Sequence, residues 1–439
     1  MKISPEKRKH ILDALRRGTV PDANLDAFAV GLDPFESTVA DELRSVAAGG
    51  AVFKAVRGEY GCGKTFFVRW VADRARKLGF ATSEVQISET ETPLHRLETV
   101  YRRLLEMLAT ADTRSGALRN IIDGWLYTLE EDVLREERVS PDDEGRLLSA
   151  TTDLLEKRLS SIGQMAPMFA AALRGYLRAQ AAGEVAIADG ILAWVAGQPN
   201  VAAGAKRYAG LKGDIDHFGA LNFLVGLLTV LRDSGKGGLF VTLDEVETIQ
   251  RVRSDARDKS LNALRQLIDE VDSGRFPGLY LMITGTPAFF DGQQGVRRLE
   301  PLSQRLHVDF QTDARFDNPR AVQLRLPAFD LDKLVSVGTK IRDMYAEQSV
   351  ERARISERCS DQTVEKLARE VAGRLGGKVG VAPRVFLKKL VAEVLDRVEQ
   401  FADFDPEKHY RLTLSDAELT PVERAASAAE TVNDIELDL

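Results

Sequence analysis

The sequence predicts an α/β fold in which helices flank a parallel β-sheet, and three observations support this prediction. Two continuous apolar runs, at 238–243 and 278–284, have the character of central parallel strands, which are buried on both faces. A helix expected at 260–272 joins them, so strands and helices alternate as a parallel sheet requires. The third observation is a glycine-rich segment at 58–65, which lies between a predicted strand and a predicted helix.

The first half of the chain predicts a helical segment, the start of the sheet and then a helical insertion. Residues 1–50 carry apolar residues at helical spacing, with helices expected at 5–17 and 37–48 and a connecting loop at 21–34. The next elements expected are a strand at 51–56, a helix at 66–78, a strand at 80–87 and a helix at 94–109. Charged and alanine-rich sequence then predicts a helical insertion at about 110–215, with helices at 148–162, 166–182 and 183–197, followed by a helix at 218–232.

The second half predicts a separate helical domain and a tail. We expect a core at 51–330 that carries the sheet and the insertion, and an α-helical lid domain at 331–411 with helices at 331–348, 361–375 and 383–401. Residues 412–439 form an acidic tail, because positions 415–439 hold seven acidic residues against a single arginine. Such a composition predicts a mobile tail or a partner-docking segment.

Composition excludes several classes of protein. The 439 residues have a formal net charge of −7, which argues against a surface that binds nucleic acid over its whole extent. No apolar stretch approaches the roughly 20 residues that span a bilayer, and the N-terminal residues lack the apolar segment of a secretory signal. The two cysteines and five histidines show no disulfide or metal spacing. We therefore expect a cytoplasmic protein without a membrane partner.

The glycine-rich segment matches the G-x-x-x-x-G-K-[ST] spacing of a phosphate-binding loop. Glycines let the backbone curl so that successive N–H groups and the N-terminus of the next helix face phosphate oxygens. Lys64 is expected to reach the β- and γ-phosphates of ATP, and the Thr65 hydroxyl to coordinate Mg²⁺. The alternative is a glycine-rich turn that caps an ordinary helix. The predicted nucleotide-binding residues here are Gly58, Glu59, Tyr60, Gly61, Cys62, Gly63, Lys64, Thr65 and Phe66.

A pair of carboxylates follows the apolar run at 238–243. Asp244 is expected to hold Mg²⁺ and Glu245 to polarise the attacking water. On the neighbouring strand, Thr284 is the candidate to present a hydroxyl to the γ-phosphate or the water, and Thr286 is the competing choice. A solvated strand end and ordinary β propensity are the alternative explanations.

Two arginines complete the predicted catalytic and binding set. Arg305 is a candidate arginine finger that acts on the site of a neighbouring subunit, with Arg297 and Arg298 as rivals, whereas a surface arginine is the alternative. Arg384 begins the third lid helix directly after a proline and is predicted to contact the nucleotide, whereas a structural ion pair is the alternative.

The basic residues of the sequence do not decide whether the protein contacts DNA. Lys378, Lys388 and Lys389 form a group, and Arg102 and Arg103 form another. Lysines on helices usually belong to solvated faces, and no interleaved aromatic residues support base stacking.

The order of these motifs resembles AAA+ ATPases of the initiator and helicase-loader type. More closely, Gly58–Thr65, the run Trp194–Pro199 and the run Gly238–Glu247 resemble the BREX system ATP-binding protein family, BrxD, over roughly residues 20–400. The resemblance implies a homo-oligomeric component of bacterial anti-phage defence. Its implied partners are ATP, a DNA helicase or another defence-system protein, and DNA. Cys62 departs from the small residues common at this loop position. Because the backbone makes the phosphate contacts there, ATP binding is expected to survive, although oxidation of Cys62 could inhibit it.

Three functional hypotheses follow. The first is a mechanochemical ATPase that loads or regulates a DNA helicase. The second is a nucleotide switch or signalling scaffold with little turnover, which the full set of Glu245 and arginines disfavours. The third is an autonomous helicase or translocase, which the lack of a second motor motif disfavours.

Overall fold

The computed structural model describes residues 3–136, 140, 142–374 and 383–414. The chain divides into two compact units. The first unit comprises Met1–Thr38, Val56–Asp73 and Asp309–Leu439, and the second comprises Val39–Ala55 and Arg74–Val308. Lys378 of the basic group and residues 415–439 of the predicted tail at 412–439 lie outside the described residues.

A parallel five-stranded sheet runs through the fold in the order β2-β3-β4-β1-β5. Every residue of β3 and β4 is buried, which confirms that these apolar runs form central strands. Phe240 on β3 lies opposite Tyr280 on β4, and their rings meet edge to face at 5.3 Å. The strand bounds are β1 (Val52–Arg57), β2 (Ala81–Gln86), β3 (Leu239–Asp244), β4 (Leu279–Gly285) and β5 (Gln323–Arg325).

A charged residue within β1 is accommodated by pairing. Lys54 is 3% exposed, and its Nζ lies 2.7 Å from Oε1 of Glu42 on α2. The Tyr280 hydroxyl donates to the other carboxylate oxygen of Glu42 at 2.7 Å. A buried ammonium is tolerated only with such partners, so this cluster joins β1, β4 and α2 in the second unit.

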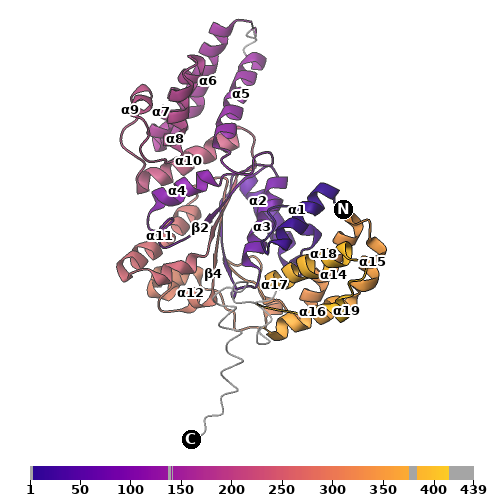
Figure 1. The fold of residues 1–439 in the computed structure, drawn as a ribbon. Helices are drawn as coiled ribbons and strands as arrows, with labels where there is room; N and C mark the ends of the chain where they lie inside the picture. The colour runs from indigo at the N-terminus through magenta and orange to yellow at the C-terminus, as the bar shows by residue number, and fades with distance from the viewer. Residues whose placement is uncertain (1–2, 137–139, 141, 375–382, 415–439) are drawn as a thin grey trace. The chain divides into compact units, whose positions relative to one another are not determined.

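The helices of the second unit fall into an insertion and a set that follows the strands. Phe223 of α10, the helix after the insertion, packs edge to face against Phe169 and Trp194 of the insertion and against Tyr101 of α4. Figure 1 shows α5 and α6 as a long antiparallel pair. The bounds are α4 (Leu97–Glu106), α5 (Leu118–Glu136), α6 (Glu144–Met165), α7 (Pro167–Ala181), α8 (Val185–Val195), α9 (Ala203–Tyr208), α10 (His217–Asp233), η2 (Val246–Arg251), α11 (Ser254–Asp272), α12 (Pro287–Asp291), η3 (Val296–Arg298) and α13 (Glu300–Leu306).

The first unit combines N-terminal helices with a C-terminal helical group. Helix α1 packs against α14, α17 and η6, and α14 packs against α16. The helical group is coloured orange to yellow in Figure 1. Its bounds are η4 (Ala314–Phe316), α14 (Leu331–Gln348), α15 (Arg352–Arg358), α16 (Asp361–Arg374), α17 (Pro383–Lys388), η6 (Lys389–Leu395), α18 (Asp396–Gln400) and α19 (Pro406–His409). The N-terminal elements are α1 (Pro5–Arg16), η1 (Leu25–Ala27), α2 (Asp33–Ala47) and α3 (Lys64–Lys77), of which α2 and α3 extend into the second unit.

Several predicted boundaries differ from the structure. Helix α2 begins at Asp33 rather than at 37, and α11 begins at Ser254 rather than at 260. The short edge strand β5 was not predicted, because three residues carry too little periodicity to be recognised. Within the described residues, no helix is both long enough and apolar enough to cross a membrane.

Candidate functional site

The glycine-rich loop turns sharply between β1 and α3. Gly61 and Gly63 have φ angles of 78° and 96°, a region that L-residues with a side chain rarely adopt. A Cβ on Gly58 would lie 2.4 Å from the Cys62 Sγ, so only glycine fits there. The loop is therefore a backbone cradle whose shape depends on its glycines.

Lys64 occupies the inside of this loop. The residue is 8% exposed, and its Nζ donates to the carbonyl oxygens of Gly58 at 2.8 Å and Glu59 at 3.1 Å. The ammonium also lies 5.1 Å from the centre of the Tyr60 ring, within the range of a cation–π contact. The neutral groups around Lys64 leave its positive charge available to an anion that enters the loop.

Cys62 is shielded from the solvent. It is 4% exposed, and burial raises the pKa of its thiol, although the nearby Lys64 charge acts in the opposite direction. A thiol that resists ionisation reacts slowly with oxidants. The structure thus weakens the expectation that Cys62 is a ready site of oxidation.

The first turns of α3 are held by the N-terminal segment. Phe66 meets Phe28 edge to face at 5.3 Å, and Arg69 donates to the Val20 carbonyl at 2.6 Å. Trp70 donates its indole N–H to Asp26 at 2.8 Å. Thr65 is half-buried in the first turn of this helix. Residues 20–28 thereby fix the helix that carries Lys64 and Thr65.

In the second unit, the ends of β3 and β4 bring three predicted residues together. Asp244 is 7% exposed and Thr284 is fully buried, and the Thr284 hydroxyl donates to the Asp244 carboxylate. The backbone N–H of Glu245 donates to Thr284 Oγ1 at 3.1 Å and to Asp244 Oδ1 at 3.2 Å. Thr284 is thus bonded both to the candidate metal ligand and to the backbone of the candidate base.

Glu245 adopts an unusual backbone conformation. Its φ and ψ angles are 59° and 43°, a left-handed region that costs a residue with a side chain roughly 1–2 kcal/mol. Such strain is common at functional sites. The left-handed conformation of Glu245 ends β3, and the Glu245 side chain is partly exposed.

Gln86 is a site residue that sequence reasoning missed. Its side-chain amide donates to Glu245 Oε2 at 2.9 Å. Gln86 is the last residue of β2, which pairs with β3, and Gln86 lies opposite Asp244 in the register. A polar residue that ends a strand next to the acidic strand was the available signal.

The two candidate threonines have different roles. Thr286 is the N-cap of α12, and its Oγ1 accepts the Phe289 N–H at 3.3 Å. Thr284, by contrast, donates its hydroxyl proton to the Asp244 carboxylate.

The candidate finger arginines lie beside α11. Arg305 on α13 forms an ion pair with Asp269, and its Nη1 donates to the Pro301 carbonyl at 2.8 Å. Arg298 binds Asp258 and lowers the pKa of that carboxyl through their hydrogen bond, whereas Arg297 is exposed.

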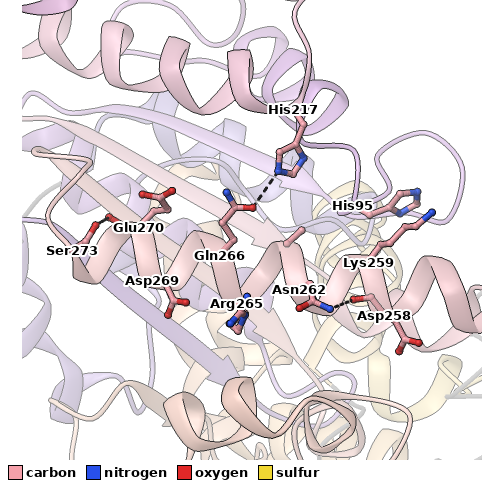
Figure 2. A pocket seen from close by; sticks show the side chains of 11 residues that line it. His95, His217, Asp258, Lys259, Asn262, Arg265, Gln266, Asp269, Glu270 and Ser273 are labelled. Carbon is pink, nitrogen blue, oxygen red and sulfur yellow. Dashed lines mark hydrogen bonds between the residues drawn. The ribbon is translucent and has the colours of Figure 1, made fainter. Parts of the chain in front are cut away.

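Asp258 and Asp269 also line a hollow of about 760 Å³ along α11, shown in Figure 2. The hollow carries both signs of charge and two imidazoles. Its lining consists of His95, His217, Asp258, Lys259, Asn262, Ala263, Arg265, Gln266, Asp269, Glu270 and Ser273.

Arg384 is exposed at the start of α17, in the first unit. Its Nη1 lies 3.8 Å from the point that a Cβ on Gly18 would occupy. Arg384 is therefore next to Gly18, and Val20, two residues further along the chain, bonds to Arg69 of α3. Lys389, by contrast, is 1% exposed and bonds to Glu393. The Lys389 ammonium is therefore not at the surface, where a DNA backbone could reach it.

The residues present fit ATP and Mg²⁺. A loop that turns at two glycines with positive φ angles, with a lysine inside it, suits a polyphosphate. The Thr65 hydroxyl and the Asp244 carboxylate are the oxygen ligands that Mg²⁺ prefers.

A parallel sheet with a glycine-rich loop after one strand and an acidic pair after another is typical of nucleotide-binding α/β proteins. The model of the family described as BREX system ATP-binding protein BrxC/D matches residues 3–414, so the chain belongs to this family. The family's description implies that its members bind ATP. No curated protein matches the chain.

Proposed function

We propose that this chain binds and hydrolyses ATP as a component of a BREX-type anti-phage defence system. The observation that carries the proposal is the bonded trio of Asp244, Glu245 and Thr284 in a chain that belongs to an ATP-binding family. A strand end that only needed solvation would have no reason to bury a carboxylate and to bond it to a buried hydroxyl.

One ATP is bound by both motifs in this proposal. The strand order supports it, because β4 with Thr284 is flanked by the loop strand β1 on one side and the acidic strand β3 on the other. Ligands of open α/β sheets bind at the carboxyl ends of the strands, where such residues gather. Lys64 then exchanges its carbonyl partners for phosphate oxygens.

Each residue has a defined role in the reaction. Thr65 and Asp244 hold Mg²⁺, which when bound neutralises charge on the phosphates. Glu245 orients the attacking water and accepts its proton. Thr284 fixes Asp244 and the Glu245 backbone, and Gln86 holds the Glu245 carboxylate through its 2.9 Å hydrogen bond.

The two arginines act around the triphosphate. Arg384 contacts the nucleotide from α17, and Arg305 acts in the site of a neighbouring copy in a homo-oligomer. For this, Arg305 must leave Asp269, and an ion pair between side chains that are each about a third exposed contributes only about 0–1 kcal/mol. Such a pair is weak enough to be exchanged on assembly.

The protein partner is a DNA helicase or another defence-system protein, and DNA is a further candidate ligand. Phosphate release by purified protein, with and without DNA, tests the function. Lys64→Ala is expected to abolish nucleotide binding, and Glu245→Gln to retain binding and lose turnover. Turnover at the wild-type rate in Glu245→Gln would refute the assignment. Binding without measurable turnover in the wild type, with or without DNA, would favour the nucleotide switch.

A further inference from the structure

The pairing of β2 with β3 ends at the candidate site. Gln86, the last residue of β2, lies opposite Asp244, and the backbone N–H of Ile87 donates to the Asp244 carbonyl at 2.9 Å. A parallel ladder would continue with a bond from the N–H of Val246 to the Ile87 carbonyl. The left-handed backbone of Glu245 turns the chain into η2 at this point, so the ladder stops beside the hydrogen bond between Gln86 and Glu245.

Thr248 supplies the next bond to the end of β2. Its hydroxyl donates to the Ile87 carbonyl at 3.3 Å, and its backbone N–H donates to the Glu245 carbonyl at 3.1 Å. One residue therefore connects the backbone of the candidate base to the residue that follows Gln86. Valine at position 248 would keep the shape of the side chain and the backbone bond, but it would lose the bond to Ile87.

A chain of hydroxyl groups closes the other side of Gln86. Thr92 is 6% exposed, and its hydroxyl donates to the Gln86 carbonyl. Ser88 Oγ lies 3.2 Å from Thr92 Oγ1, and because the Thr92 proton is used on Gln86, Ser88 is the donor in this contact. Ser88 Oγ also accepts the backbone N–H groups of Glu91 at 3.1 Å and Thr92 at 3.0 Å. The turn at 88–92 thereby fixes the backbone of Gln86.

The contact that these bonds surround depends on its backbone. Gln86 is exposed and Glu245 is partly exposed, so water competes for their 2.9 Å hydrogen bond. Both side chains are long, and each loses rotamer freedom when it is held in one conformation. Such a bond forms readily only where the backbone already sets the separation of the two side chains. Thr92 and Thr248 provide this restraint from the two sides of the contact.

We infer that Thr92 and Thr248 are positioning residues for ATP hydrolysis, because they fix the two backbone segments that bring the Gln86 amide to the Glu245 carboxylate. This inference rests on the proposed function, in which Glu245 orients the attacking water. Neither threonine has an assigned contact with the nucleotide or with Mg²⁺. Both act through the contact between Gln86 and Glu245, so their loss lowers kcat and leaves ATP affinity unchanged.

Turnover of threonine variants gives the first test. Thr92→Val and Thr248→Val should each lower kcat about two- to tenfold in phosphate release by the full-length protein, at unchanged KM for ATP. Thr92→Ser and Thr248→Ser keep the hydroxyl and should retain most of the wild-type rate. Thr229→Val is the matched control, because it removes a hydroxyl–carbonyl bond of 2.9 Å on α10, and it should leave kcat unchanged. Wild-type kcat in both valine variants at 92 and 248, or an equal loss in Thr229→Val, would overturn the inference.

Combined variants test how the threonines act. If Thr248 acts through the contact between Gln86 and Glu245, Thr248→Val should cause little further loss of kcat in a Gln86→Leu protein. Thr92→Val combined with Gln86→Leu should behave in the same way. Full additivity of the changes in both combinations would overturn the positioning role.

Hydrogen exchange supplies a readout that needs no turnover. In nucleotide-free protein, Thr92→Val should raise the amide exchange rate about threefold or more in peptides covering 86–92, and Thr248→Val should do so at 244–248. Thr229→Val should change neither segment. Faster exchange in the variants of a protein that hydrolyses no ATP would contradict the proposed function and leave the restraint of the two segments standing. Unchanged exchange in both segments would overturn the inference.

Discussion

Replacing Thr284 by valine tests how the acidic strand end is organised. The change keeps the side-chain shape, but it removes the donor to the Asp244 carboxylate and the acceptor of the Glu245 N–H, which lies 3.1 Å away. A hydrogen bond to a charged group contributes about 1.5–3 kcal/mol. Because about 1.4 kcal/mol corresponds to tenfold in rate, loss of this contribution in the transition state predicts a kcat lower by about 10- to 150-fold.

Thr286→Val is the matched control, since it is the same change two residues away at another buried position. It removes an N-cap from α12 and should reduce the free energy of unfolding by about 0.5–2 kcal/mol with little change in kcat. The assay is phosphate release at saturating ATP, with thermal unfolding of each variant measured beside it. A kcat that falls for Thr286→Val and not for Thr284→Val would refute the reasoning.

Three further predictions concern neighbouring residues. Gln86→Leu should lower kcat about two- to tenfold at unchanged ATP affinity, because it removes the hydrogen bond to Glu245. The control is Gln198→Leu, which removes a similar bond to Glu106 and should leave kcat unchanged. Equal effects of the two changes on phosphate release would count against a role for Gln86. Cys62 and Cys359 are buried, and burial raises the pKa of both thiols. Thiol-reactive dyes should therefore label both cysteines slowly in the native protein and fully in denaturant. Rapid labelling of the native protein would contradict their burial. Mixing Arg305→Ala with Glu245→Gln subunits should restore part of the hydrolysis, and no recovery at any ratio would exclude a finger in trans.

The central strands and the loop were predictable because their signals are local. The runs at 238–243 and 278–284 are mostly apolar and contain no charged residue, which predicts strands buried on both faces. The glycines of the loop likewise predict a backbone conformation with positive φ angles, which other residues rarely adopt.

Other features depend on contacts between distant segments, which periodicity does not reveal. Gln86 joins Glu245 only because β2 pairs with β3 in one particular register. Lys389 has the sequence pattern of a surface lysine, but in the structure it is buried and bonded to Glu393. The position of Arg305 after the strand that carries Thr284 made it a candidate finger from the sequence. Its ion pair with Asp269 could not be predicted, because it depends on how α13 packs on α11.

The most direct test of the account is the Mg²⁺ dependence of ATP affinity in the wild type and in Asp244→Asn, measured by calorimetry with and without the metal. If the glycine-rich loop and the acidic strand end share one metal-bound nucleotide, Mg²⁺ should tighten ATP binding about tenfold or more in the wild type, and Asp244→Asn should lose this gain while keeping its metal-free affinity. An Asp244→Asn protein that gains as much from Mg²⁺ as the wild type would contradict a shared site.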